Sequence, residues 1–282
     1  MIRHRPRPLR LVERTVAVLH QPVQDAAAAR NGSGALVIGG LNAADTSVDA
    51  IRFVSVRGDA PRGALAGARH DAAAVSLGGA TYVFGGGDGL RQLDEIVAVG
   101  PGGRARIAGR LPQPASDAAA AAIGGTAYVV GGYTGRRWLD TILAWRPGGK
   151  ARIVARLPEA LRYAAVTAAG GKLVIAGGSL PSGTASNAVL VFDPAQGRVR
   201  RIGRLPAPTT HGAAAALGGT AYVIGGRGPA TGTPTARIVA VDPATRTVRW
   251  AGSLVQPRSD LAAVALPGRI LLVGGRRATG VS

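Results

Sequence analysis

Cysteine is absent from the 282 residues of this chain, which excludes structural disulfides, thiolate nucleophiles and cysteine-ligated zinc or iron–sulfur sites. Aromatic residues are scarce as well, at 4% of the chain, although 46% of the residues are hydrophobic. The core must therefore be built mainly from Ala, Val, Leu and Ile. No run approaches the roughly 20 apolar residues that cross a bilayer as a helix, so no membrane span is predicted.

Acidic residues are few, and nearly all the basic ones are arginine. The chain has 34 Lys and Arg against 15 Asp and Glu, and its only lysines are Lys150 and Lys172. The formal charge of +19 attracts polyanions non-specifically. Heavy use of Arg, Ala and Gly also fits a GC-rich genome, and we favour this explanation over a nucleic-acid partner.

Residues 1–8 are basic, and no apolar segment typical of a signal peptide follows them. We expect them to form a flexible tail on a single domain spanning residues 1–282, and we expect a monomer. The compartment stays open: extracytoplasmic if a signal peptide is missing from this sequence, and cytoplasmic otherwise.

The chain repeats one unit six times. A diglycine follows an apolar run at spacings of 46, 46, 46, 48 and 49 residues, in the pairs Gly39–Gly40, Gly85–Gly86, Gly131–Gly132, Gly177–Gly178, Gly225–Gly226 and Gly274–Gly275. A fixed period of this length is typical of solenoids and propellers.

Each unit contains four short apolar runs separated by turns, most clearly in residues 111–157. The alanine-rich run at 118–122 resembles a helix, but it is short, ends at Gly-Gly and leads directly into Tyr128 and two valines. A β-hairpin is the better interpretation. We predict an all-β fold, a six-bladed β-propeller of four-stranded blades, in which N-terminal strands from residues 9–19 close the last blade.

The sequence resembles the kelch family, as a divergent bacterial member. The motifs that carry the resemblance are the diglycines, Tyr82, Tyr128 and Tyr222 three residues before three of them, the turns Asp193–Pro194 and Asp242–Pro243, and Arg258–Ser259–Asp260. The tryptophan usual in the outermost kelch strand remains only as Trp250. The resemblance implies a fold shared by actin-binding proteins, substrate adaptors, a copper oxidase and a sialic acid epimerase, so the site must decide the function.

A candidate site lies fourteen residues before each diglycine. These positions begin the expected innermost strands, and we call them the axial ring: Asp25, Asp71, Asp117, Tyr163, His211 and Asp260. Four carboxylates around one opening raise the pKa of some of them unless cations offset the charge. Arg69, Arg162 and Arg258 are placed to do so. The functional interpretation of the ring is a site for a cation or a polar ligand, on which Asp, Tyr and His converge. The alternative, which we favour for any single Asp, is that it bonds turn amides between blades.

The loops after the diglycines are expected on the same face, and they vary in length while the repeat does not. One of them carries Tyr133, Arg136 and Trp138, which could stack on a sugar or hold an anion; alternatively, Trp138 folds over its own blade. His4 and His20 lie outside the expected ring, and His70 and His211 lie in opposite blades, so no metal site is predicted.

Two functions follow from these observations. The first is a binding or interaction module for a small polar ligand, a glycan or a protein partner, with no cofactor. The second is a carbohydrate-active kelch-type enzyme, an epimerase or lyase in which His211 or a ring Asp acts as general base and Arg162 holds an anionic group, with Tyr163 as a further catalytic candidate. The copper oxidase chemistry is excluded, because its cofactor requires a cysteine crosslinked to tyrosine.

Overall fold

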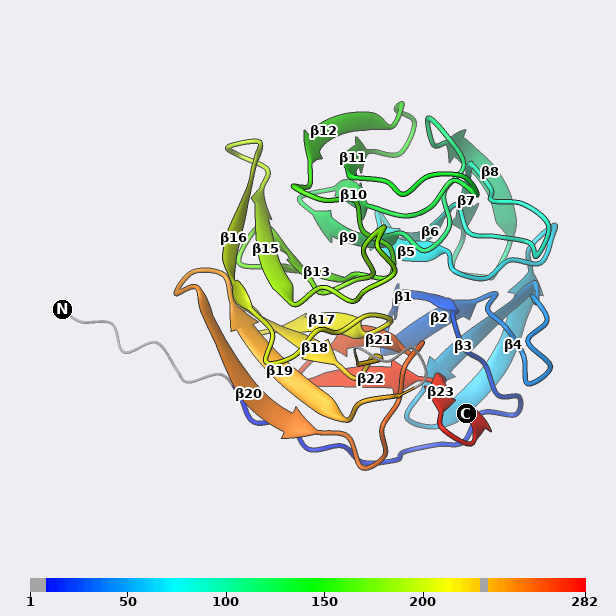
Figure 1. The fold of residues 1–282 in the computed structure, drawn as a ribbon. Coiled ribbons are helices and arrows are strands. Elements are labelled where there is room, and N and C mark those ends of the chain that lie inside the picture. The colour runs from blue at the N-terminus through cyan, green and yellow to red at the C-terminus, as the bar shows by residue number, and fades with distance from the viewer. Residues whose placement is uncertain (1–8, 229–232) are drawn as a thin grey trace.

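The structure is a computed structural model that describes residues 9–228 and 233–282, so the predicted tail at 1–8 lies outside the described residues. Every element in the described part is a β-strand. Its strands radiate from a central axis as antiparallel sheets (Figure 1). The prediction of an all-β propeller is confirmed. No helix among the described residues has the length and apolar character needed to cross a membrane.

Five four-stranded blades follow one another along the chain. The first contains β1 (Ala27–Asn31), β2 (Gly34–Ile38), β3 (Ala50–Ser55) and β4 (Gly58–Ala64); the second β5 (Ala73–Leu77), β6 (Ala80–Phe84), β7 (Glu95–Val99) and β8 (Ala105–Arg110); the third β9 (Ala119–Ile123), β10 (Thr126–Val130), β11 (Thr141–Trp145) and β12 (Arg152–Arg156). The fourth contains β13 (Ala165–Ala169), β14 (Lys172–Ala176), β15 (Ala188–Asp193) and β16 (Arg198–Arg204), and the fifth β17 (Ala213–Leu217), β18 (Thr220–Ile224), β19 (Arg237–Asp242) and β20 (Thr247–Ser253).

The sixth position of the circle holds only a two-stranded hairpin, β21 (Ala262–Leu266) and β22 (Arg269–Val273). A second short pair, β23 (Arg276–Arg277) and β24 (Gly280–Val281), lies in the loop after the last diglycine. The prediction of six four-stranded blades is therefore wrong. β21 contacts both β17 and β1, so the hairpin still closes the circle between the fifth and first blades.

The predicted N-terminal closing strands are also wrong. Residues 9–19 run along the perimeter from β20 to β4 (Figure 1, dark blue) and form no regular strand. The Leu11 N–H donates to the carbonyl of Ala251 in β20, and His20 bonds Asp59 in β4. Side chains such as Leu11 and Leu19 also attach the segment by packing onto core clusters that include residues of β22.

The diglycines have a steric reason. The first glycine of each pair has a left-handed φ and lies against the backbone of the following blade's connection. A Cβ on Gly131 would overlap the carbonyl oxygen of Leu161, and one on Gly274 would overlap that of Val23. The last contact joins the end of the circle to its beginning. The repeat that marks the sequence is thus the point where neighbouring blades meet.

The hydrophobic core is divided among the six gaps between neighbouring blades. Aliphatic side chains dominate each cluster, as the composition predicts. The largest buried side chain, Trp145, packs edge-on against Tyr82 and Phe84 between the second and third blades. The alanine-rich innermost strands, such as β9, pack side by side around the axis, where little space is available for larger side chains.

Candidate functional site

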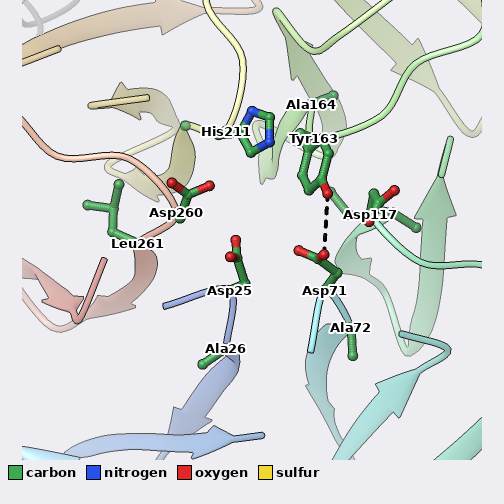
Figure 2. A pocket seen from close by; sticks show the side chains of 13 residues that line it. Asp25, Ala26, Asp71, Ala72, Asp117, Tyr163, Ala164, His211, Asp260 and Leu261 are labelled. Carbon is green, nitrogen blue, oxygen red and sulfur yellow. Dashed lines mark hydrogen bonds between the residues drawn. The ribbon is translucent and has the colours of Figure 1, made fainter. Parts of the chain in front are cut away.

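The axial ring is a closed circle of backbone hydrogen bonds. The N–H of each ring residue donates to the carbonyl of the ring residue in the preceding blade, at 2.9 to 3.2 Å, and the N–H of Asp25 donates to Asp260. The short hairpin supplies the sixth member, so the ring is complete although the sixth blade is not. All six side chains line one small cavity of about 140 Å³ on the axis (Figure 2).

Every ring residue has a left-handed backbone, with φ between 52° and 59°. Asp tolerates this conformation because its short side chain bonds locally, whereas larger side chains in it cost on the order of 1 kcal/mol or more. Tyr163 and His211 nevertheless occupy two of the six positions. The ring therefore retains Tyr163, whose large side chain this backbone conformation disfavours, and has His211 where four other units have Asp.

Arginines neutralise two of the four ring carboxylates. The Nε of Arg162 lies 2.5 Å from Oδ2 of Asp117, and Nη2 of Arg227 lies 2.7 Å from Oδ2 of Asp260. Both carboxylate side chains are almost fully buried, at 2% and 0% exposed, so these pairs are shielded from water. Ser259 also donates its hydroxyl hydrogen to Asp260.

Of the three arginines predicted to offset the ring charge, only Arg162 contacts a ring carboxylate in the structure. Arg69 bonds Glu95 at the start of β7, and Arg258 bonds Glu13 of the N-terminal segment. Each also donates to a diglycine carbonyl, Gly85 or Gly274, which holds the guanidinium beside the blade. Arg69 thus anchors the connection that enters the second blade to that blade, and Arg258 joins the connection before β21 to the N-terminal segment.

Arg227 is the ring partner that sequence reasoning missed. It follows the fifth diglycine directly and is paired by a β-bridge with Thr210, next to His211. The same bridge recurs in all six units, between the residue before each ring position and the residue after each diglycine. Counting one residue forward from the diglycines would have revealed this second circle around the mouth.

Within the part of the chain that the structure describes, Asp25 and Asp71 make no ion pair with arginine, and their pKa values are raised well above the usual range. Burial is the largest cause for both. For Asp25 the charges of Asp71 and Asp260 add to it, and for Asp71 the main charge is that of Asp117. The hydroxyl of Tyr163, 3.3 Å from Oδ2 of Asp71, acts in the opposite direction (Figure 2).

Tyr163 and His211 stack face to face, with ring centres 3.7 Å apart and planes 22° apart. Burial lowers the pKa of His211 to about 4, so its imidazole is neutral at physiological pH. Its Nδ1 lies 3.0 Å from the Thr210 hydroxyl, which in turn lies 2.6 Å from that of Ser179. Burial also raises the pKa of Tyr163, which keeps its hydroxyl protonated.

A wider hollow of about 580 Å³ opens over the ring, and we call it the vestibule. Five ring residues line both the vestibule and the small axial cavity: Asp25, Asp71, Tyr163, His211 and Asp260. The wall includes Arg227, Arg276 and Arg277, of which Arg276 is bonded to Asp45 at 3.0 Å. Carboxyl, imidazole, phenol and guanidinium groups thus face one space.

The predicted aromatic loop lies on the same face, but outside the vestibule. Tyr133 and Trp138 are partly buried, and the Arg162 guanidinium carbon lies 4.4 Å and 4.9 Å from their ring centres. Trp138 therefore neither points freely into solvent nor folds only over its own blade, because its face is covered by an arginine of the next one. Arg136 is exposed, and like Tyr133, Trp138 and Arg162 it lines neither cavity.

Among the described residues, no three His, Asp or Glu side chains are placed to hold a metal ion together. His70 lines the vestibule, with Nε2 3.7 Å from Oδ2 of Asp71, and its Nδ1 lies 2.8 Å from the Ser47 hydroxyl. His20 bonds Asp59 on the outside of the molecule. His4 lies outside the described residues.

Comparisons with known proteins agree with this architecture. The family model described as the kelch motif matches residues 114–150, which span the third blade up to the turn before β12. The solved structure titled "Structure of YjhT" is similar, with a TM-score of 0.80, 17% sequence identity and 93% of each chain covered. No curated protein matches the sequence. The kelch motif is thus matched in the third blade, and the similar structure agrees with the propeller fold.

Proposed function

We propose that this chain is a single-domain binding module that holds a small polar ligand, such as a glycan, in the vestibule over the axial ring. The observation that carries the proposal is the pair of Tyr163 and His211, which occupy left-handed positions and line the vestibule. The scaffold imposes this backbone conformation at all six ring positions but does not require Tyr or His in it, and side chains kept at such a cost are found mainly at functional sites. Asp or Gly would fit both positions with less strain.

The dimensions and lining of the vestibule suit such a ligand. Its volume of about 580 Å³ lies within the range of small-molecule sites. Hydrogen-bond acceptors on Asp25, Asp71 and Asp260 face donors on Arg227, and the exposed part of the Tyr163–His211 stack offers an apolar surface. A concave hollow of this kind favours a small ligand over a flat protein surface.

Nucleic acid is not the proposed partner. The arginines of the outermost strands β8, β12, β16 and β20 are distributed around the perimeter instead of along one face (Figure 1). Nucleic-acid binding requires a continuous basic surface, commonly with aromatic residues between the charges.

The test is thermal denaturation with a panel of neutral sugars, oligosaccharides and acidic sugars including sialic acid. A ligand at 100 times its Kd stabilises by about 2.7 kcal/mol, which raises the Tm by roughly 5 to 10 °C for a chain of this size. We expect a shift for the parent protein and for Arg136→Ala, and none for Tyr163→Asn combined with His211→Asn. Equal shifts in all three proteins would place the binding outside the vestibule.

A carbohydrate-active enzyme is the second candidate. A neutral His211 and the carboxyl groups of Asp25 and Asp71, with their raised pKa values, share one cavity, as a general base and a general acid require. Arg227 lines that cavity and Arg162 does not, so an anionic substrate group would meet Arg227. The sugar that raises the Tm should then be converted, as followed by proton NMR, and His211→Asn should stop conversion. Binding of the sugar without its conversion would contradict the enzyme and support the binding module.

A further inference from the structure

We propose that the floor of the vestibule, between Asp25, Asp71 and Asp260, binds a primary ammonium group of the ligand and releases protons as it does so. This inference rests on the proposed function, because it assigns the chemistry of the ligand group that reaches the ring. It follows from the charges, the burial and the hydrogen bonding of the ring.

The ring has more carboxyl groups than cations to balance them. Arg162 pairs with Asp117 and Arg227 with Asp260, while Asp25 and Asp71 have no arginine partner among the described residues. Ionising both would place two uncompensated negative charges in a nearly closed space, which is strongly unfavourable. The raised pKa values of Asp25 and Asp71 favour protons on these carboxyls instead, and a bound cation would make those protons unnecessary.

Asp260 provides a second, independent observation. Its side chain is fully buried, at 0% exposed, and its Oδ1 has no hydrogen-bond donor among the described residues. The Asp25 carboxyl lies beside it, facing the same cavity (Figure 2). Two carboxylates cannot bond to each other, so this oxygen is satisfied only by a proton on Asp25 or by a donor that enters the cavity.

An ammonium group fits the space better than the alternatives. Calcium requires six to eight oxygens at 2.3 to 2.6 Å, and no three acidic or histidine side chains converge in this way among the described residues. An ammonium carries a charge and three donors with N···O distances of about 2.8 Å, so it can reach carboxyls that stand further apart. The neutral stacked rings of Tyr163 and His211 at its side do not repel it.

The charged and titratable groups around the two carboxyls define the proton balance. Those around Asp25 are Asp71, Asp260, Tyr163 and Arg227. Those around Asp71 are Asp25, Asp117, Asp260, Tyr163 and His70. When the ammonium binds, each carboxyl that ionises loses its O–H proton to solvent, and the ammonium keeps its own three. Binding should therefore strengthen as the pH rises through the range in which these carboxyls titrate.

The probe is methylammonium chloride, compared with sodium chloride and tetramethylammonium chloride at equal ionic strength. Titrated into weakly buffered full-length protein between pH 5 and 8, methylammonium should release on the order of one proton per chain and raise the Tm. Tetramethylammonium, which has no N–H donor, and sodium should do neither. Asp25→Asn combined with Asp71→Asn should abolish the release, whereas Asp94→Asn, on an exposed salt bridge, should retain it.

Equal responses to the three salts, or unchanged release in the double variant, would overturn the inference. The proposed function is tested separately by the sugar panel. A neutral sugar that stabilises the parent but not the Tyr163 and His211 variant, together with no response to methylammonium, would refute the ammonium site and support the vestibule. Because Asn tolerates a left-handed backbone, the variants should fold, and a parent-like circular dichroism spectrum would verify this.

Discussion

The two arginine-bound carboxylates of the axial ring differ in what surrounds the arginine. The Arg162 and Arg227 side chains are similarly exposed, at 23% and 26%, so solvent access does not distinguish them. Their neighbours do. Arg162 is surrounded by the rings of Tyr133, Trp138 and Tyr163, whereas Arg227 borders the vestibule.

This difference indicates that one arginine of the axial ring stabilises the fold, whereas the other is available for a ligand. The guanidinium of Arg162 has its faces covered and its Nε bound to Asp117, so it has little capacity left for a ligand. Arg227 donates from Nε to both Asp260 and Ser259 and from Nη2 to Asp260. It nevertheless remains part of the wall of the vestibule. We expect Arg162 to fix the ring between the third and fourth blades and Arg227 to contribute to recognition from the vestibule wall.

The largest effect on stability should come from removing Arg162, the arginine that is packed among aromatic rings. Arg162→Ala leaves the buried Asp117 without its partner and removes the cation–π contacts, which should destabilise the protein by about 3 to 5 kcal/mol. Urea denaturation measures the change, with Arg136→Ala in the same loop region as a control that should stay within about 0.5 kcal/mol of the parent. A loss below about 1 kcal/mol would mean that Asp117 is satisfied without Arg162.

Arg227→Ala should cost less stability, about 1 to 3 kcal/mol, because Ser259 still donates to Asp260 and the cavity admits water. Ligand binding should show the reverse order. In the thermal assay, Arg227→Ala should change the Tm shift that sugars cause. Arg162→Ala should show the same Tm shift as the parent, although it starts from a lower Tm. Equal effects of the two substitutions on binding would contradict the distinction between Arg162, packed among aromatic rings, and Arg227, in the vestibule wall.

The unpaired carboxyls should give the protein a specific pH dependence. Their raised pKa values mean that the folded state binds more protons than the unfolded state above the ordinary Asp range, so stability falls as the pH rises through that window. Asp25→Asn with Asp71→Asn should flatten this fall, by about 1.4 kcal/mol for every tenfold difference in proton affinity between the folded and unfolded states. Urea midpoints from pH 4 to 8 measure it, and an unchanged slope would contradict the assignment.

The smallest effect should be that of the Tyr163 hydroxyl. Tyr163→Phe preserves the stack on His211 but removes the 3.3 Å hydrogen bond to Asp71. In the parent protein this hydrogen bond lowers the pKa of the Asp71 carboxyl. The pKa of Asp71 should therefore rise further, with a loss of about 0.5 to 1 kcal/mol at neutral pH. Carboxyl carbon NMR titration would show the rise, and a fall in the pKa would indicate that the hydroxyl does not donate to Asp71.

Much of the fold could be predicted from the sequence, because the repeat is enforced locally. Each diglycine is required where the next blade's backbone leaves no space for a Cβ, so the steric need appears directly as a period. The axial ring could be located for the same reason, since it stands at a fixed distance before each diglycine. The extent of the last blade could not be predicted, because the apolar residues of segment 9–19 suggest strands, yet isolated hydrogen bonds, the Glu13–Arg258 pair and packing hold the segment at the rim.

The sequence by itself determined the kelch resemblance, the all-β propeller and the six positions of the axial ring. Only the tertiary structure decided which arginines reach the ring: Arg162, one residue before its ring position, bonds Asp117, whereas Arg69 and Arg258, two residues before theirs, bond glutamates. Glu95 and Glu13 capture two of them, and Arg227 arrives from a loop after a diglycine. Such pairings depend on distances between side chains of different blades, and no local pattern in the chain encodes those distances.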